Sequence, residues 1–343
     1  MEQKSVLIGM SGGVDSSVAA ALLKEQGYHV IGATMRLWTY SDSCNMKHEG
    51  CCAESAVEDA RRVCDKLGID FYVMNFKDMF KDKVVDYFVD EYIHGRTPNP
   101  CIACNKYLKF DALLKKALAM GIDYVATGHY AKIEKGEDGK YILRASEAVK
   151  KDQSYVLYNF TQEQLAHTLM PLGGYNKDWV RQKAEELGLG VAHKPDSQEI
   201  CFVEDDDYAK FITDYSGYKP KEGDILDVNG NVIGKHRGLI YYTIGQRKGI
   251  GAYGRPMFVM KIDAENNTIT LGEKGMEFSN ELTAYDVNFV SGEFPKENML
   301  ITAKVRYQAP PAAAMLCPQK DGTVKLMFPE PQRAVTPGQA VVF

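Results

Sequence analysis

Residues 11–17 read Ser11-Gly12-Gly13-Val14-Asp15-Ser16-Ser17 and come just after the apolar run Val-Leu-Ile at 6–8. A strand that ends in glycines and hydroxyl side chains and then continues as a helix directs backbone N–H groups at one place, where they favour negative charge. The stretch is not a Walker A loop, because no lysine follows Gly13, and it is not Gly-x-Gly-x-x-Gly. It therefore predicts a phosphate-binding loop of another kind.

The first half of the chain alternates strand-like and helix-like patterns. Because strands separated by helices pair in parallel, this alternation predicts a doubly wound α/β sheet, whose ligands bind beyond the carboxyl ends of the strands. The phosphate loop, Met35 and the stretch 127–129 fall at that edge. The expected strands are 6–9, 29–35, 71–75 and 124–127, and the expected helices are 15–26, 53–67, 79–92 and 110–120.

The pattern changes after about residue 215. Weaker helical segments at 178–187 and 207–215 give way to short β-rich runs separated by turn signals at 227–231, 263–267 and 320–322. A charged, glycine-containing hairpin loop is expected earlier, at 134–140. We expect three domains: an α/β domain over 1–215, a small central β-rich domain over 216–279 and a C-terminal β-barrel over 280–343.

The composition is that of a globular protein without a membrane-spanning helix. The 343 residues are 25% charged and 45% hydrophobic, with a net charge of -5, which is ordinary for a globular protein and does not indicate a nucleic-acid binder. No apolar run approaches the roughly 20 residues of a membrane-spanning helix, and the N-terminus has no signal-peptide profile. We expect a cytoplasmic protein without a membrane partner.

The chain has eight cysteines, which in a cytoplasmic protein favour thiol or metal chemistry over structural disulfides. Cys101 and Cys104 lie in the stretch Thr-Pro-Asn-Pro-Cys-Ile-Ala-Cys-Asn at 97–105, where two prolines predict an extended, stiff loop and not a helix start. From the residues alone, half a zinc site, a redox pair and a thiolate nucleophile all stay open. Cys201 follows the polar run 196–199 and is either a core residue or a thiol at the surface.

Several motifs occur in a fixed order: SGGVDSS (11–17), TPNPCIACNKYLKF (97–110), ATGHYA (126–131), KDQSYVL (151–157), PDSQEICFV (195–203), GQRKG (245–249) and VRY (305–307). In order and spacing they resemble the tRNA-specific 2-thiouridylases, a family of ATP pyrophosphatases. The resemblance covers essentially the whole chain, including the change from helical to β-rich sequence.

The resemblance implies a tRNA sulfurtransferase, which replaces the C2 oxygen of the wobble uridine of lysine, glutamate and glutamine tRNAs with sulfur. ATP would adenylate that oxygen, and pyrophosphate would leave together with Mg²⁺, for which Asp15 is our candidate ligand. The implied ATP-binding residues are Gly9, Met10, Ser11, Gly12, Gly13, Val14, Asp15, Ser16, Met35 and Gly128.

The resemblance also implies roles for two thiols. Cys201 would carry a persulfide, loaded by a sulfur donor such as a cysteine desulfurase or a relay protein. Cys104 would be the partner thiol, acting through a disulfide with Cys201 or through released sulfide. The target base would lie against Asn99, Pro100 and Cys101, and the tRNA would contact His129, Lys151, Asp152, Gln153, Arg306, Tyr307 and Gln339.

Two features depart from the family pattern. Some members have aspartate at the position of Cys101, so this thiol is a bystander, a redox switch with Cys104, or part of an iron–sulfur cluster with Cys104 and Cys201. Cys44, Cys51 and Cys52 lie in an insert and are either loop thiols or metal or redox groups. The competing functions are a nitrogen-transferring ATP pyrophosphatase and an iron–sulfur or zinc module that binds tRNA.

Overall fold

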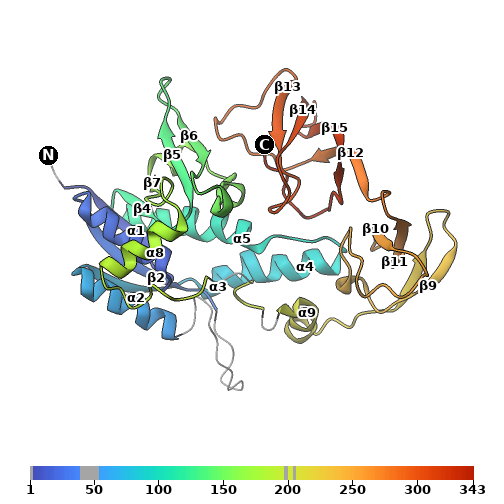
Figure 1. Cartoon of the computed structure of the whole chain (residues 1–343), viewed down its shortest axis with the longest axis horizontal. Helices are drawn as coiled ribbons and strands as arrows, with labels where there is room; N and C mark the ends of the chain where they lie inside the picture. Colours follow the sequence, from blue (N-terminus) through green and yellow to red (C-terminus); the bar gives the residue numbers. More distant parts are fainter. Residues whose placement is uncertain (1–2, 39–53, 197–199, 204–205) are drawn as a thin grey trace. The chain divides into compact units, whose positions relative to one another are not determined.

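The computed structural model describes residues 3–38, 54–196, 200–203 and 206–343. They form two compact units, drawn in Figure 1. The first unit comprises Met1–Val84, Cys101–Phe202 and Asn288–Glu293, and the second comprises Val85–Pro100, Val203–Val287 and Phe294–Phe343.

The first unit is built on a five-stranded parallel sheet with the order β3-β2-β1-β4-β7. The expected doubly wound sheet is therefore confirmed. The chain proceeds outward from β1 to β2 and β3 and then returns to the other side of β1, so the strand order reverses between β1 and β4. Ligands of open α/β sheets bind at such a point. The strands are β1 (Ser5–Gly9), β2 (His29–Arg36), β3 (Asp70–Asn75), β4 (Tyr124–Ala126) and β7 (Thr168–Leu169).

Helices α1 (Val14–Glu25), α2 (Glu54–Leu67) and α8 (Lys177–Glu186) share one hydrophobic core with β1. Val6, Leu7 and Ile8 of β1 are fully buried, which explains why this strand is uniformly apolar and not alternating. The remaining short elements of the unit are a hairpin of β5 (Ala131–Lys135) and β6 (Tyr141–Ala145), the 3-10 helices η3 (Val149–Lys151) and η4 (Ser154–Leu157), and α7 (Gln162–Ala166). The hairpin confirms the turn expected at 134–140.

One local expectation was wrong. The proline-rich stretch does not stay extended as far as its cysteines, because a helix begins at Pro100. Proline suits the first helical position, since its φ angle is already helical and the N–H that it lacks would have no partner there. The helix runs through α5 (Pro100–Ala103), a π-helix η2 (Cys104–Ala112) and α6 (Leu113–Ala119). The long helix expected at 79–92 is likewise divided into α3 (Lys77–Phe80), π-helix η1 (Lys81–Asp86) and α4 (Tyr87–Ile93).

The second unit contains two four-stranded sheets, with the orders β10-β11-β8-β9 and β12-β15-β14-β13. The turns expected near 227, 263 and 320 join antiparallel pairs, as predicted. Its elements are α9 (Tyr208–Ser216), β8 (Gly223–Leu226), β9 (Val232–His236), η6 (Leu239–Tyr241), β10 (Met257–Asp263), β11 (Thr268–Glu273), β12 (Phe278–Ala284), β13 (Met299–Ala303), β14 (Ala312–Pro318) and β15 (Val324–Arg333).

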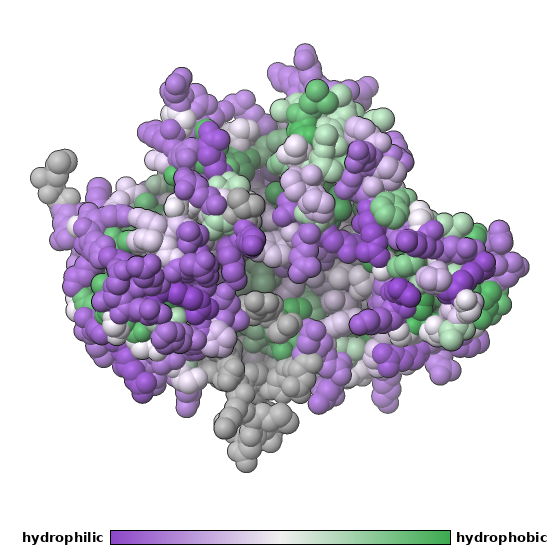
Figure 2. Space-filling model, in the orientation of Figure 1, coloured by the Kyte–Doolittle hydropathy of each residue, from purple (hydrophilic) through white to green (hydrophobic). Residues whose placement is uncertain are grey.

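The surface in Figure 2 is mostly hydrophilic, with an apolar group of side chains over β13 and β14. Leu300 on β13, the edge strand of its sheet, is 82% exposed. Within the described part of the chain, no helix has the length and apolar character needed to cross a membrane.

Candidate active site

The loop after β1 is tied closely to its neighbours. The N–H of Met10 donates to the carbonyl of Ala33, and the hydroxyl of Thr34 donates to the carbonyl of Met10, both at 2.8 Å. Gly12 has a φ angle of +71°, and a Cβ there would lie 2.2 Å from the carbonyl oxygen of Ala56. Only glycine fits this conformation and this close approach.

The serines of the motif shape the loop from inside. The hydroxyls of Ser16 and Ser17 both donate to the carbonyl of Gly13, at 3.2 and 2.8 Å, and the N–H of Ser11 donates to Ser16 Oγ at 3.2 Å. Gly13 caps α1 with an extended backbone and, having no side chain, leaves the first N–H groups of the helix without a side-chain cap. Such groups bind anions.

The loop after β4 packs against the same helix end. A Cβ on Gly128 would lie 2.7 Å from the backbone nitrogen of Ser16 and 2.8 Å from the carbonyl carbon of Asp15. The glycine therefore allows two loops, on either side of the point where the strand order reverses, to meet backbone to backbone. His129 bonds to the hydroxyl of Thr127 through Nδ1 at 2.7 Å. Burial, with Lys109 acting in the same direction, lowers the pKa of His129 well below its ordinary value, so the ring is neutral.

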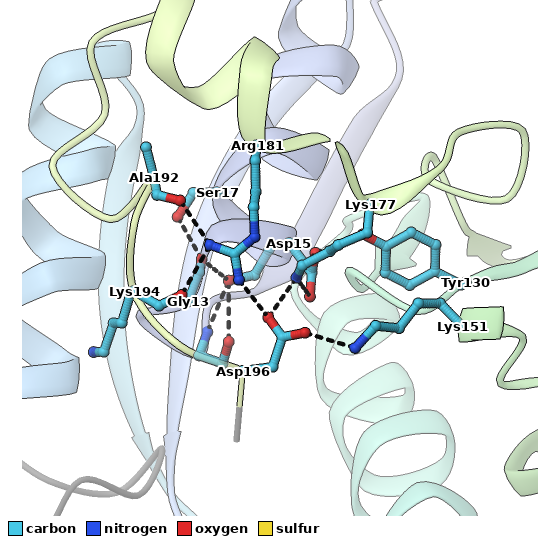
Figure 3. A network of polar contacts seen from close by, with 12 residues as sticks. Gly13, Asp15, Ser17, Tyr130, Lys151, Lys177, Arg181, Ala192, Lys194 and Asp196 are labelled. Carbon is cyan, nitrogen blue, oxygen red and sulfur yellow. Dashed lines mark hydrogen bonds and ion pairs between the residues drawn. The ribbon is translucent and has the colours of Figure 1, made fainter. Parts of the chain in front are cut away.

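Asp15 lies in the first turn of α1 and is the centre of an ion-pair network that Figure 3 shows. Lys177, the first residue of α8, contacts both carboxylate oxygens at 2.7 and 2.8 Å, and the hydroxyl of Tyr130 donates to one of them at 2.6 Å. Burial first, and then the Asp15 charge, raises the pKa of Tyr130, which keeps the phenol protonated as a donor. Lys177 is largely buried and also contacts Asp196 at 2.7 Å.

Asp196 extends the network toward the segment that carries Cys201. It accepts from Lys151 at 2.7 Å and from Arg181 at 3.2 Å, in addition to Lys177. Burial by itself would raise the pKa of Asp196, but the hydrogen bonds from Lys151 and Lys177 outweigh it and hold this pKa below its ordinary value. The carboxylate is thus charged and holds three cations near the loop.

Lys194 completes this group of cations. Its ammonium donates to the carbonyl of Gly12 at 3.1 Å and to Asp59 at 2.9 Å. Sequence reasoning did not find Tyr130, Lys177, Arg181 or Lys194, because their roles depend on contacts between residues up to 182 positions apart. The only signal was that Tyr130 lies within the motif at 126–131 and that Lys194 directly precedes the motif at 195–203.

The expected metal sites are Asp15 for Mg²⁺ and the cysteines for iron. Lys177 contacts both carboxylate oxygens of Asp15, so a Mg²⁺ ion bound there would share this carboxylate with Lys177. No group of three or more histidine, cysteine or acidic residues that could hold a metal occurs in the described ranges, which include Cys101, Cys104 and Cys201. The iron–sulfur set considered from the sequence is therefore not assembled in this structure.

The cysteines differ in accessibility. Cys104 is 8% exposed and follows directly after α5, whereas Cys101 and Cys201 are exposed. The three lie in the first unit, and each is a thiol. The next residue along the helix, Asn105, is buried and donates to the carbonyl of Val156 at 3.0 Å, which ties the helix to η4. Cys44, Cys51, Cys52 and the stretch 197–199 lie outside the described residues.

The expected tRNA contacts in the first unit make internal bonds. Besides the ion pair of Lys151, the side chain of Asp152 accepts from the N–H of Ser146 at 2.9 Å. Gln153 accepts from the N–H of Tyr130 through its side chain and donates to the Tyr130 carbonyl through its backbone, both at 2.9 Å. Gln153 therefore holds the loop that contains Tyr130. Met35 is half-buried at the end of β2, beside Met74 of β3.

The expected contacts in the second unit include one exposed residue and two with internal partners. Tyr307 is 39% exposed, with the Lys304 ammonium 5.7 Å from the centre of its ring. Arg306 donates to the carbonyl of Ala334 and to the hydroxyl of Thr336. Gln339 donates to the carbonyl of Thr97 at 2.7 Å. Asn99 and Pro100 directly precede Cys101 in the chain.

Comparison with known proteins gives family matches along most of the chain. Residues 4–205 match the tRNA methyl transferase HUP domain, 209–273 the tRNA methyl transferase PRC-barrel domain, and 279–343 the aminomethyltransferase beta-barrel domain. A tRNA-specific 2-thiouridylase MnmA of Acetivibrio thermocellus is 58% identical over 100% of this chain and 96% of its own.

The chain belongs to the tRNA-specific 2-thiouridylase family. A second family member, from Clostridioides difficile, is 58% identical over 99% of this chain and 94% of its own, and one from Clostridium botulinum is 57% identical over 100% and 95%. The predicted family, the α/β and β-barrel fold class and the sulfurtransferase class of enzyme are confirmed. The N-terminal region has the ATP-utilising HUP fold.

Proposed function

We propose that this protein converts the wobble uridine of lysine, glutamine and glutamate tRNAs to 2-thiouridine, with ATP as the activating substrate. The main support is the loop at the reversal point of the sheet, where a helix N-terminus and two glycine loops meet. Lys151, Lys177, Arg181 and Lys194 are tied to this loop through Asp15, Asp196 and the Gly12 carbonyl. The N–H groups at the start of α1 favour an anion such as the ATP polyphosphate, and the four cations outnumber the three carboxylates Asp15, Asp59 and Asp196 with which they pair. The family relationship indicates tRNA as the second substrate. We place this reaction in the cytoplasm, where tRNA serves in translation.

The first step is adenylation of the base. The C2 oxygen of the uridine attacks the α-phosphate of ATP and displaces pyrophosphate, so that the oxygen becomes part of a good leaving group, AMP. The N–H groups at the start of α1 and the cations Lys177, Arg181 and Lys194 stabilise the charge that develops on the departing pyrophosphate. The base must leave the anticodon stack to reach this site, and Asn99, Pro100 and Cys101 would line its position.

The second step delivers sulfur. The terminal sulfur of a Cys201 persulfide attacks C2 and displaces AMP, which leaves the base joined to Cys201 through an S–S bond. The Cys104 thiolate then attacks the Cys201 sulfur, so that 2-thiouridine departs and a Cys104–Cys201 disulfide forms. Alternatively, Cys104 attacks the persulfide first and releases sulfide, which attacks C2 with the same final products. A thiol reductant regenerates both cysteines, and a cysteine desulfurase or a relay protein reloads the exposed Cys201.

The test is a thiolation assay with tRNA, ATP and a persulfide donor, followed by mass spectrometry of the nucleosides. We expect AMP, pyrophosphate and 2-thiouridine in the wild type, and no 2-thiouridine in Cys104→Ser or Cys201→Ser. Cys317→Ser, which removes a half-buried thiol of the C-terminal sheet, is the matched control and should keep full activity. An ammonia-dependent product that survives both catalytic substitutions would instead identify a nitrogen-transferring enzyme.

A further inference from the structure

Thr97 begins the stretch that leads into the helix containing Cys101 and Cys104. Residues near the C-terminus bind both the N–H and the carbonyl of Thr97. Its N–H donates to the carbonyl of Pro337 at 2.9 Å, and its carbonyl accepts from the Gln339 side chain at 2.7 Å. The Thr97 hydroxyl also contacts that of Thr243 at 3.3 Å. All of these residues belong to the second unit.

The turn formed by residues 336–339, called the clamp turn here, fits closely against Thr97. A Cβ on Gly338 would lie 2.7 Å from the Thr97 nitrogen and 3.0 Å from its carbonyl carbon and oxygen. Gly338 also has a φ angle of +91°, which side chains rarely adopt. The absence of a side chain at Gly338 is therefore what lets the turn approach the Thr97 backbone.

The clamp turn is itself fixed from the C-terminal sheet. Arg306 donates to the hydroxyl of Thr336 at 3.0 Å and to the carbonyl of Ala334. The Thr336 hydroxyl donates to the same carbonyl at 2.8 Å, and the N–H of Gln339 donates to the Thr336 carbonyl at 3.1 Å. Arg306 and Gln339, both expected from the family to contact tRNA, are thus part of one internally bonded arrangement.

The chain beyond Thr97 is stiff. Pro98 and Pro100 fix two of the next three φ angles, and each restricts the residue before it. A displacement of Thr97 is therefore carried along the chain to Asn99 and Pro100, the last residues of the second unit before Cys101. The position of the clamp turn sets where this segment begins.

We propose that the clamp turn is a positioning element for the segment 99–104, so that Arg306 and Gln339 act on catalysis by holding Thr97. This inference rests on the proposed function, in which that segment lines the target base and supplies the partner thiol. It assigns Gly338 and Thr97 roles in the reaction although neither reacts.

The test compares Gly338→Ala with Gly322→Ala. Gly322 is in the same C-terminal region and has a similar φ angle of +84°, but a Cβ there meets nothing within 4 Å. Both substitutions carry the same backbone strain, and only the first pushes against Thr97. We expect Gly338→Ala to lower kcat for thiolation by about 10- to 100-fold, since small misplacements cost that much. The Kd for tRNA should stay within about twofold of the wild-type value, because misplacement acts on the reacting groups and not on tRNA binding. Gly322→Ala should keep the wild-type kcat.

Gln339→Ala separates positioning from direct contact with tRNA. Positioning predicts a lower kcat with an unchanged Kd for tRNA, whereas a contact role alone predicts a higher Kd with an unchanged kcat. Gln319→Ala is the control, because its side chain bonds only locally, to the carbonyl of Cys317. Equal kcat values for Gly338→Ala and Gly322→Ala, or a loss in Gln339→Ala that lies wholly in Kd, overturn the proposal.

A second measurement does not depend on thiolation. Maleimide labelling of Cys104, followed by mass spectrometry, reports how well the helix start is held in the protein without substrates. We expect labelling of this buried thiol to be several-fold faster in Gly338→Ala than in Gly322→Ala. If the wild type fails to thiolate tRNA, the proposed function fails, and the labelling still decides whether the clamp turn positions the segment. Equal labelling rates then reject it.

Discussion

At the scale of single residues, Lys177 occupies a position near the phosphate loop that is unfavourable for a cation. It is the first residue of α8, where the helix dipole disfavours positive charge, and its ammonium is held by Asp15 and Asp196. In Lys177→Met the two carboxylates lose their shared counter-charge. We expect the free energy of unfolding, measured with denaturant, to fall by about 1–3 kcal/mol.

Lys183→Met is the matched control for this prediction. Lys183 is on the same helix, but it pairs at 2.8 Å with Glu25, whose side chain is 48% exposed. Exposed pairs contribute little, so the loss should stay below about 1 kcal/mol. An equal loss in the two variants would contradict a structural role for the Asp15–Lys177–Asp196 arrangement.

Asp196 predicts how stability depends on pH. Because its pKa is lower in the folded chain than in the unfolded chain, its ion pairs stabilise the fold fully above the unfolded pKa of about 3.9. This contribution is lost as the pH falls toward the lower folded value. Asp196→Asn should therefore be less stable than the wild type at neutral pH, and the two should converge in acid. Unfolding measured from about pH 7 to pH 3 tests this, and a difference that is constant with pH would contradict it.

At the scale of elements, Gly128 determines whether the loop after β4 can reach the start of α1. In Gly128→Ala the new methyl group meets the backbone of Asp15 and Ser16, which cannot move without displacing the helix start. We expect the Kd for a non-hydrolysable ATP analogue, measured by calorimetry, to rise at least about tenfold, since the N–H groups of α1 bind the anion. Gly190→Ala, where a Cβ meets nothing within 4 Å, should bind as the wild type does.

The elements also show what sequence reasoning can reach. Strands β1 to β4 were predictable because each is a short apolar run between helical patterns, and the β hairpins because their turns carry Asn, Asp and Gly. The two-residue β7 has no pattern to detect. The helix start at Pro100 was missed because proline is compatible with both an extended segment and a first helical turn, and only the tertiary fold chooses between them.

The candidate site also has a part that the sequence predicted and a part that it did not. The phosphate loop was predictable because consecutive residues form it. Asp15 was a candidate Mg²⁺ ligand because a carboxylate in a phosphate loop is a natural metal ligand, and the sequence did not indicate its ion pair with Lys177, 162 positions away. Such a partner leaves no periodic trace in the sequence. Likewise, nothing in the motif containing Thr97 indicates that a turn near residue 338 holds it.

At the scale of the whole molecule, the two compact units each have a hydrophobic core, one around β1 and α1 and another around β10 and β11. The chain passes between the units several times, but the phosphate loop lies wholly in the first unit. A ligand that binds only the folded state stabilises the unit that contains its site, by about 2.7 kcal/mol at a concentration of 100 Kd.

We therefore expect two calorimetric transitions on heating, of which a non-hydrolysable ATP analogue raises only one. For a unit of this size each kcal/mol corresponds to about 2–4 °C, so the shift should be about 5–10 °C. Gly12→Ala, in which a methyl group collides with the Ala56 carbonyl, should abolish the shift while both transitions remain. A single transition that the analogue raises as a whole would contradict this prediction, because it would show that the two cores unfold as one cooperative structure.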